Sequence, residues 1–259
     1  DGTTLILLAD PFTFPVDHFV TGLAERHPGL TVVGGLASAA VAPGGNRLVA
    51  DDKVVADGAV GVLLPVGLAV HPVVSQGCRP VGTPLVVTAA HDNLIEEIAG
   101  RPALERVREL AEALDPDERK RAAQGLQIGV VQDERLEEFG PGDFLVRPVL
   151  GADKASGAVA VGLDIEVGTT VQFHVRDAAA ADQDLRGVLA GEDGAAALVF
   201  TCNGRGLRLF GEPHHDARVL HEHVEGGAVA GMFCAGEVGP IGGRPHVHGF
   251  SACILLFED

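Results

Sequence analysis

The densest group of reactive side chains in this 259-residue sequence is Cys-Asn-Gly-Arg-Gly at 202–206. It directly follows an apolar run, 197–201, that predicts a buried strand. Polar and glycine residues at the end of a strand in an α/β fold are where ligands usually bind. The two glycines allow a sharp turn that directs N–H groups at an anion, and Arg205 offers a two-pronged donor to a carboxylate. The motif predicts either an anion site or a glycine turn with a surface arginine.

A second segment, 236–244, contains four glycines, Glu237 and a proline. It is not a phosphate-binding loop, because no Gly-Lys-Ser/Thr follows, and it is not the dinucleotide fingerprint after a strand. Glu237 is its single acidic residue and could receive an ammonium group. The alternative is a structural crossover loop.

Seven of the eleven histidines lie after residue 173, which raises the possibility of a metal site. His246 and His248 are two apart in a predicted strand and therefore share one face, a spacing that zinc sites use. His221 and His223 are two apart on a predicted helix and diverge. Without a third convergent ligand, hydrogen-bonded or solvent-facing histidines are favoured, and neither a metal nor another cofactor is predicted.

A thiol nucleophile is the other catalytic option. Cys202 with His215 and Asp216 could form such a group, but nearness in sequence is no evidence of geometry. A free cysteine more often acts as a small buried hydrophobe. A thiol- or metal-assisted hydrolase therefore remains an alternative to a non-enzymatic protein.

The composition restricts the partners. Asp and Glu outnumber Lys and Arg by 36 to 19, a net charge of −17, which repels nucleic acid and anionic membranes. The longest apolar stretch, 59–74, is interrupted by glycine and proline, so no membrane helix is predicted. Four widely spaced cysteines without a CxxC pair favour a reducing, cytoplasmic compartment. The chain does not begin with Met and opens on a core strand, so we expect a fragment of a longer protein.

Hydrophobic periodicity predicts an α/β fold with mixed sheets covered by helices. Helices are predicted from Pro15 to before Pro28, at 104–114, 115–124 and 178–189, and after Pro213. Strands are predicted at 5–9, 30–33, 59–64, 70–74, 85–88, 128–131, 144–149, 159–161, 170–176, 197–201, 228–233 and 251–257. The last part repeats the order of the first, with Gly35 opposite Gly231, which predicts an internal duplication rather than chance similarity. Two related halves, divided near residue 100, are expected to bring their glycine loops together at a cleft.

The sequence also resembles a known family. The stretch 198–206, Leu-Phe-Gly at 209–211, Asp216, and 231–243 followed by His-Gly-Phe at 248–250 resemble the C-terminal FIST domain. Asp-Pro-Phe at 10–12, Val-Gly-Gly at 33–35 and 75–80 resemble the latter part of the N-terminal FIST domain. The resemblance implies domains at 1–100 and 101–259, and a sensory module of signal-transduction proteins that binds small ligands such as amino acids. No output domain is present in the sequence, so a signalling partner on a separate chain is expected.

Side-chain chemistry then predicts a site for a small zwitterion. Arg205, with Arg176 from a polar strand face, is expected to hold the carboxylate, and Glu237 with Asp216 the ammonium group. The predicted ligand-binding residues are Arg176, Cys202, Asn203, Gly204, Arg205, Asp216, Gly236, Glu237, Gly239, Gly242, Gly243 and His248. A protein-interaction scaffold, in which the glycine segments only shape a surface, is the third alternative.

Overall fold

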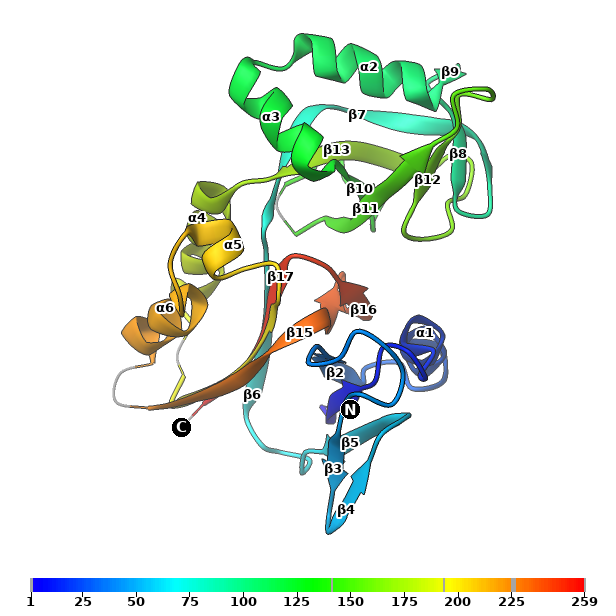
Figure 1. Ribbon diagram of the computed structural model, residues 1–259. Coiled ribbons are helices and arrows are strands. Elements are labelled where there is room, and N and C mark those ends of the chain that lie inside the picture. The colour runs from blue at the N-terminus through cyan, green and yellow to red at the C-terminus, as the bar shows by residue number, and fades with distance from the viewer. Residues whose placement is uncertain (1, 141, 193, 225–226, 259) are drawn as a thin grey trace. The chain divides into compact units, whose positions relative to one another are not determined.

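The computed structural model describes residues 2–140, 142–192, 194–224 and 227–258 (Figure 1). The chain forms two compact units, the first made of residues 1–77 and 181–259 and the second of residues 78–180. The boundaries between the compact units therefore fall after residues 77 and 180, whereas one boundary was expected near residue 100. The reason is that the main sheet of the first unit takes strands from both ends of the chain.

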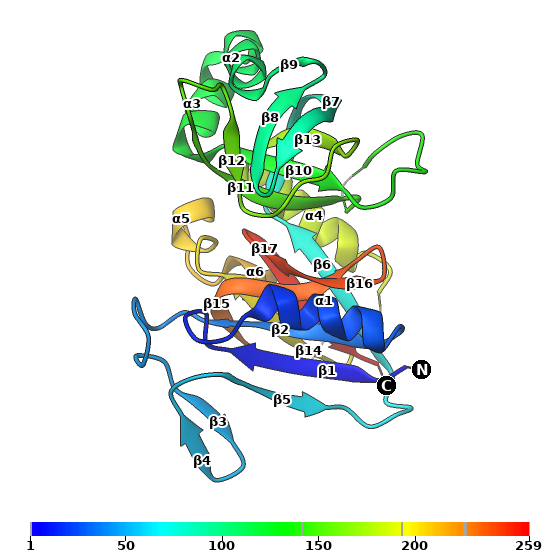
Figure 2. The same cartoon turned by 90° about the vertical axis from the view of Figure 1, so that its right-hand side faces the viewer.

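The first unit is built on an eight-stranded mixed sheet. Its strands, in spatial order, are β5 (Ala59–Leu63), β1 (Thr4–Ala9), β2 (Thr31–Ala37), β15 (Ala228–Ile241), β14 (Ala196–Cys202), β17 (Ser251–Phe257) and β6 (Val70–Gln76), with β16 (Arg244–His248) paired to β15. Its helices are α1 (Val16–Arg26), α5 (Leu207–Phe210), α6 (His215–His223) and most of α4 (Ala178–Leu189). Two short strands, β3 (Leu48–Ala50) and β4 (Lys53–Val55), form a separate hairpin that projects beyond β5 (Figure 2).

The sheet contains the predicted duplication. In the first copy, β1 pairs in parallel with β2, the strand after its helix, and antiparallel with β5. In the second copy, β14 pairs in parallel with β15 and antiparallel with β17 in the same way. The copies join through antiparallel β2 and β15. Gly34 lies opposite Leu7 and Gly231 opposite Val199, and a Cβ on either glycine would lie 1.8 or 1.9 Å from the partner's carbonyl oxygen. Gly231 therefore matches Gly34, and not Gly35 as the sequence suggested.

Apolar side chains line both faces of this sheet, as expected for strands with continuous apolar runs. On one face Val199 and Ile254 pack with helix residues such as Leu185 and Leu220, and α1 packs against β1 and β2 in a similar way (Figure 2). On the opposite face Phe200 forms a separate cluster. Neighbouring residues of β14 thus belong to different clusters.

The glycine-rich segment 236–244 is not the predicted loop. β15 continues through it to Ile241, and the chain turns at Gly242 and Gly243, whose φ angles are 56° and 76°, into β16. Two successive positive φ angles are typical of a tight hairpin turn. Gly236 and Gly239 lie within β15 where neighbours approach closely: a Cβ would be 2.9 Å from a Leu36 methyl group and 2.7 Å from the Cys253 sulfur. These glycines serve strand packing, and the expected cleft between glycine loops is not formed by this segment.

The second unit holds a seven-stranded sheet and two helices. The strands, in spatial order, are β12 (Val159–Val161), β11 (Phe144–Ala152), β10 (Gln127–Val131), β13 (Thr170–Arg176), β7 (Cys78–His91), β8 (Leu94–Ile98) and β9 (Arg101–Pro102). The predicted helices are confirmed as α2 (Ala103–Ala113) and α3 (Pro116–Gly125), and the Asp115 side chain caps α3 by accepting from the N–H of Glu118 at 2.8 Å. Across the described part of the chain, no helix is long and apolar enough to cross a membrane.

Candidate functional site

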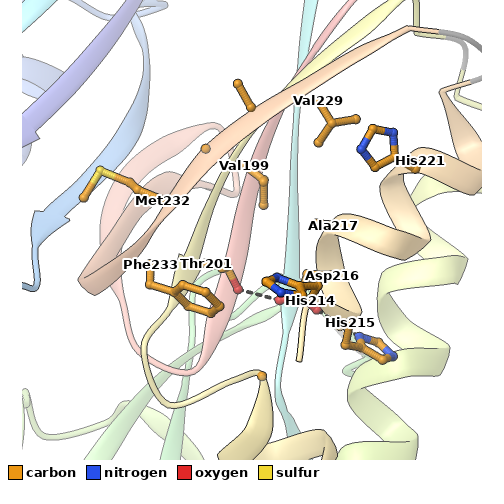
Figure 3. A pocket seen from close by; sticks show the side chains of 13 residues that line it. Val199, Thr201, His214, His215, Asp216, Ala217, His221, Val229, Met232 and Phe233 are labelled. Carbon is orange, nitrogen blue, oxygen red and sulfur yellow. Dashed lines mark hydrogen bonds and ion pairs between the residues drawn. The ribbon is translucent and has the colours of Figure 1, made fainter. Parts of the chain in front are cut away.

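A pocket of about 210 Å³ lies in the first unit between α6 and the parallel strands β14 and β15 (Figure 3). Its walls are mostly apolar, with a few polar side chains. It is lined by Val199, Thr201, Gly206, His214, His215, Asp216, Ala217, His221, Val229, Ala230, Gly231, Met232 and Phe233. A small, mainly apolar pocket with few polar groups near the carboxyl end of a parallel strand pair is the usual form of a small-molecule site.

Local structure explains how these side chains come together. Alternation along β14 directs Val199 and Thr201 to the face that α6 covers, while Cys202 points to the other face. His214 precedes α6 with a left-handed φ of 59°, a conformation that a non-glycine residue adopts infrequently. His214, before α6, and His221, on α6, both line the pocket. Within the described ranges, neither imidazole has a hydrogen-bond partner.

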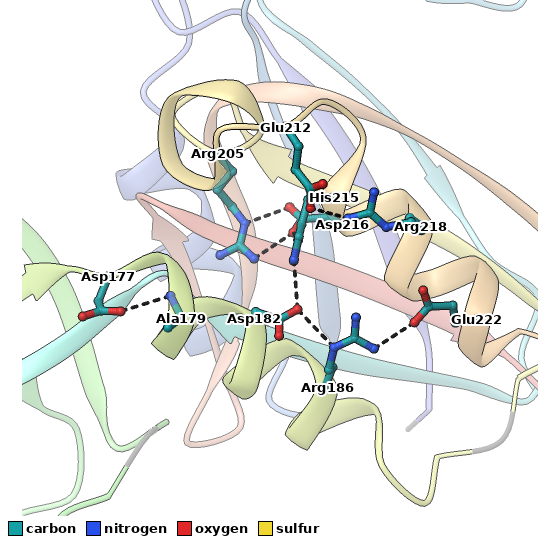
Figure 4. Close-up of polar contacts among 10 residues, drawn as sticks. All are labelled: Asp177, Ala179, Asp182, Arg186, Arg205, Glu212, His215, Asp216, Arg218 and Glu222. Atoms are coloured by element: carbon teal, nitrogen blue, oxygen red, sulfur yellow. Dashed lines mark hydrogen bonds and ion pairs between the residues drawn. The ribbon is translucent and has the colours of Figure 1, made fainter.

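A buried ion pair supports one wall of the pocket (Figure 4). Arg205 donates from Nε to Asp216 Oδ2 at 2.8 Å and from Nη2 to Oδ1 at 2.9 Å, and its side chain is wholly shielded from solvent. Thr201 donates its hydroxyl to Asp216 as well, and His215 Nδ1 lies 3.2 Å from Oδ1. Burial by itself would raise the pKa of Asp216, but these contacts, led by Arg205, outweigh it and hold the pKa below its usual value. Asp216 is therefore an ionised carboxylate already supplied with donors.

The ion pair continues into α4. His215 Nε2 lies 2.9 Å from Asp182 Oδ1, and Arg186 links Asp182 at 3.1 Å to Glu222 of α6 at 2.8 Å (Figure 4). The ring of Phe210 stacks on His215 with the ring centroids 3.6 Å apart. The imidazole of His215 is thus fixed by carboxylates on both edges and by a ring on its face, which is the arrangement of a structural residue.

Glu237 belongs to a separate cluster, with Cys202. Its Oε2 accepts from the N–H of Ser251 at 3.3 Å and from the Ser251 hydroxyl at 2.8 Å, and no N–H or O–H of the described residues reaches Oε1. Burial raises the pKa of Glu237 to about 8, although the hydrogen bonds from Ser251 act in the opposite direction and lower it. Burial and the nearby Glu237 raise the pKa of the Cys202 thiol to about 11. At neutral pH the carboxyl group is therefore mostly neutral and the thiol protonated.

The structure brings four predicted residues, Cys202, Arg205, Asp216 and Glu237, to the end of β14, but only Asp216 lines the pocket. Arg205 and Asp216 were predicted to bind opposite ends of a ligand, whereas here they bind each other. The pairing has a physical cause: a charge this deeply buried needs a partner inside the protein.

The other predicted residues lie elsewhere. Arg176 ends β13 of the second unit. Asn203 is exposed, and its backbone N–H donates to Cys234 at 2.8 Å. A Cβ on Gly204 would lie 2.5 Å from the ring of Phe250, so this glycine allows close packing. His248 is buried in β16 with Nε2 3.0 Å from the Gly239 oxygen. The role of these residues in ligand binding stays a prediction.

Sequence reasoning missed Thr201, His214, His221 and the strand segment 228–233. The seven-residue spacing of the two histidines was a usable signal, since residues seven apart on a helix share a face. The predictions above considered only pairs of histidines two positions apart. The contribution of β15 had no local signal, because it depends on the pairing of distant strands.

Three observations bear on the thiol- and metal-assisted alternatives. Within the residues that the structure describes, no group of three His, Cys, Asp or Glu side chains could hold a metal ion. The raised pKa of Cys202 is the reverse of what a thiol nucleophile requires. His215, its proposed base, contacts Asp182 and Asp216 instead.

Together, these observations describe an α/β fold with a small, mainly apolar pocket. The FIST N domain model matches residues 1–101 and the FIST C domain model residues 103–240. Uncharacterized protein Mb0898c of Mycobacterium bovis and uncharacterized protein MT0897 of Mycobacterium tuberculosis are each 49% identical to this chain over 262 residues, which cover 98% of this chain and 67% of the relative. Uncharacterized protein Rv0628c of Mycobacterium tuberculosis is also 49% identical, with 68% of the relative covered. The chain belongs to the FIST domain family, whose members are sensory domains of signalling proteins.

Proposed function

We propose that this chain senses a small amino-acid-like metabolite, bound in the pocket between α6 and β14–β15, and reports it to a signalling partner on a separate chain. The observation that carries the proposal is that two exposed imidazoles, His214 and His221, line a mainly apolar pocket and have no hydrogen-bond partner among the described residues. Family membership supports a sensory role. At about 210 Å³ the pocket is smaller than those that hold drug-sized ligands, which favours a small metabolite.

The lining suits a zwitterion with an apolar side chain. An imidazole N–H can donate to a carboxylate, and an unprotonated imidazole nitrogen can accept from an ammonium group. His214 and His221, which both line the pocket, can therefore serve the two charged groups. Val199 and Val229 provide an apolar wall for the side chain. In this proposal Arg205 and Asp216 hold the wall in place and do not contact the ligand directly.

Titration calorimetry with the common amino acids tests the proposal. Two charge-assisted hydrogen bonds of about 1.5–3 kcal/mol each and burial of an apolar side chain, less an association cost of about 4 kcal/mol or more, correspond to a Kd in the millimolar to micromolar range. His214→Ala and His221→Ala should each weaken binding about tenfold, which corresponds to the loss of roughly one hydrogen bond. His18→Ala, an exposed histidine on α1, is the matched control.

The proposal fails if no amino acid gives heat or a thermal shift, or if the two pocket variants bind like the control. A stable protein complex without any small-molecule response would instead favour a scaffold.

A further inference from the structure

The pocket adjoins an open edge of the main sheet. Residues 228–234 of β15 pair with β14 on one side. On the other side β2 pairs with β15 only from Cys234 onward. Among the described residues, no strand therefore pairs with 228–233 on that side.

The backbone groups at this edge have a defined direction. The carbonyl of Cys234 accepts from the N–H of Asn203, on the β14 side, whereas the carbonyl of Phe233 accepts from the Ser38 hydroxyl at 2.6 Å on the opposite side. Peptide groups alternate in direction along a strand. The N–H and C=O groups of Gly231 and Val229 therefore point to the same side as those of Phe233, toward the open edge.

Within the described ranges, this edge lacks the usual protection against pairing with another strand. The segment 228–233 reads Ala-Val-Ala-Gly-Met-Phe, without charge or proline, and Ala228, Ala230, Gly231 and Phe233 are exposed. Natural sheets usually guard exposed edges with charged residues, proline or a bulge. An apolar, unguarded edge is the form of sheet edge to which an extended peptide adds as a further strand.

The edge and the pocket share residues. Val229, Gly231 and Phe233 present backbone groups to the open side and also line the pocket. A chain added at this edge would therefore have the pocket beside it for one of its side chains. His214, the residue before α6, and His221, on α6, are seven positions apart, which at the rise of a helix is about 10 Å and matches about three residues of extended chain.

We propose that the ligand of this pocket is a short extended peptide that pairs with the open edge of β15 and inserts one apolar side chain into the pocket. The inference rests on the proposed function and narrows its ligand class. A free amino acid can use the pocket, but a peptide also satisfies the backbone groups of Val229 and Gly231. Recognition through backbone groups makes binding depend on the amide hydrogens of the peptide.

The test uses tripeptides of the form acetyl-Ala-Xaa-Ala-amide, with Val, Leu, Met or Phe in the middle, in titration calorimetry with the whole chain. The best peptide should bind at least about tenfold more tightly than the corresponding free amino acid, because it adds backbone hydrogen bonds. The backbone nitrogen of each of the three residues is then methylated in turn, and the terminal carboxamide is left unchanged. Since alternate amides face the sheet edge, methylation should weaken binding about tenfold either at the outer two positions or at the middle position alone.

A protein variant gives the reciprocal measurement. Val229→Pro removes an N–H that points to the open side, where proline is tolerated in an edge strand. It should weaken peptide binding about tenfold while the thermal melting curve stays cooperative. Because the methylated peptides leave the protein unchanged, they decide the question even if this variant does not fold.

The outcomes separate the two proposals. If free amino acids bind as tightly as peptides, or if methylation has the same effect at all three positions, the peptide inference is overturned and the sensory pocket stands. If neither peptides nor amino acids bind, both are overturned.

Discussion

Replacing Glu237 by Gln should make the protein more stable at neutral pH and change how its stability depends on pH. Glu237 is fully buried, and the protein surrounds it with Ser251 on one oxygen and no N–H or O–H donor of the described residues on the other. Such a site accommodates a neutral group better than a carboxylate. Glutamine has the same shape and remains neutral.

The magnitude follows from the pKa. The carboxyl group has a pKa of about 8 in the folded protein and an ordinary value of 4.5 when unfolded. Folding therefore takes up a proton between these values, so this group's contribution to stability is complete below about pH 4.5 and falls as pH rises toward 8. The slope is about 1.4 kcal/mol per pH unit, so the wild-type protein should lose about 3 kcal/mol from this source between about pH 5 and pH 7.

The assay is urea denaturation of wild type and Glu237→Gln at intervals across this pH range. Because other titrating groups act equally in both proteins, the quantity to compare is the difference in unfolding free energy. We expect the unfolding free energy of the variant, relative to that of wild type, to increase with pH by about 1.4 kcal/mol per pH unit and to level off above pH 8. A difference that stays constant over the range would refute the assignment of a neutral buried Glu237.

Three further outcomes are expected. Arg205→Met should lower the unfolding free energy by about 3–5 kcal/mol, because it leaves Asp216 charged and buried. Adding Asp216→Leu should recover most of this loss. Equal losses in the single and the double variant would contradict the ion pair. Gly187→Ala, at an exposed position in α4 with no atom near the new Cβ, should stabilise by about 1 kcal/mol, whereas Gly231→Ala should lower the melting temperature because its Cβ meets a carbonyl oxygen. Iodoacetamide at neutral pH should leave Cys202 unmodified in the native protein and label it after denaturation, as mass spectrometry of its peptide would show; rapid native labelling would revive the thiol-enzyme alternative.

Local sequence patterns predicted most of the secondary structure. The apolar run at 197–201, the alternation at 170–176 and the Asp115 cap each depend on residues only a few positions apart, and the structure has the corresponding elements. The exceptions include the short strands β3, β4, β8 and β9, which were not predicted, and 236–244, where glycines within a long strand were interpreted as a loop. Glycine weakens a strand by itself, but a close approach by Leu36 or Cys253 makes it necessary, and such contacts are not visible in the local sequence.

The candidate site was predicted less well for the same reason. Motif analysis identified Arg205, Asp216 and Glu237 as unusual charges, and each is buried. It assumed that these charges were available to a ligand, although Arg205 and Asp216 neutralise each other. Residue type can indicate that a charge needs a partner, but only the folded arrangement decides whether that partner is a ligand or another side chain.

The amino-acid order alone determined which segments became strands and helices, and it specified a repeated strand–helix–strand unit, because these properties arise from short-range periodicity and steric limits on the backbone. The tertiary structure decided that β15 pairs with β2, about 200 positions earlier in the chain. Among the described residues, it thereby left 228–233 of β15 without a strand partner on the side of β2. The pocket lies where α6 covers the strand pair β14–β15, an arrangement that no single segment of the sequence specifies by itself.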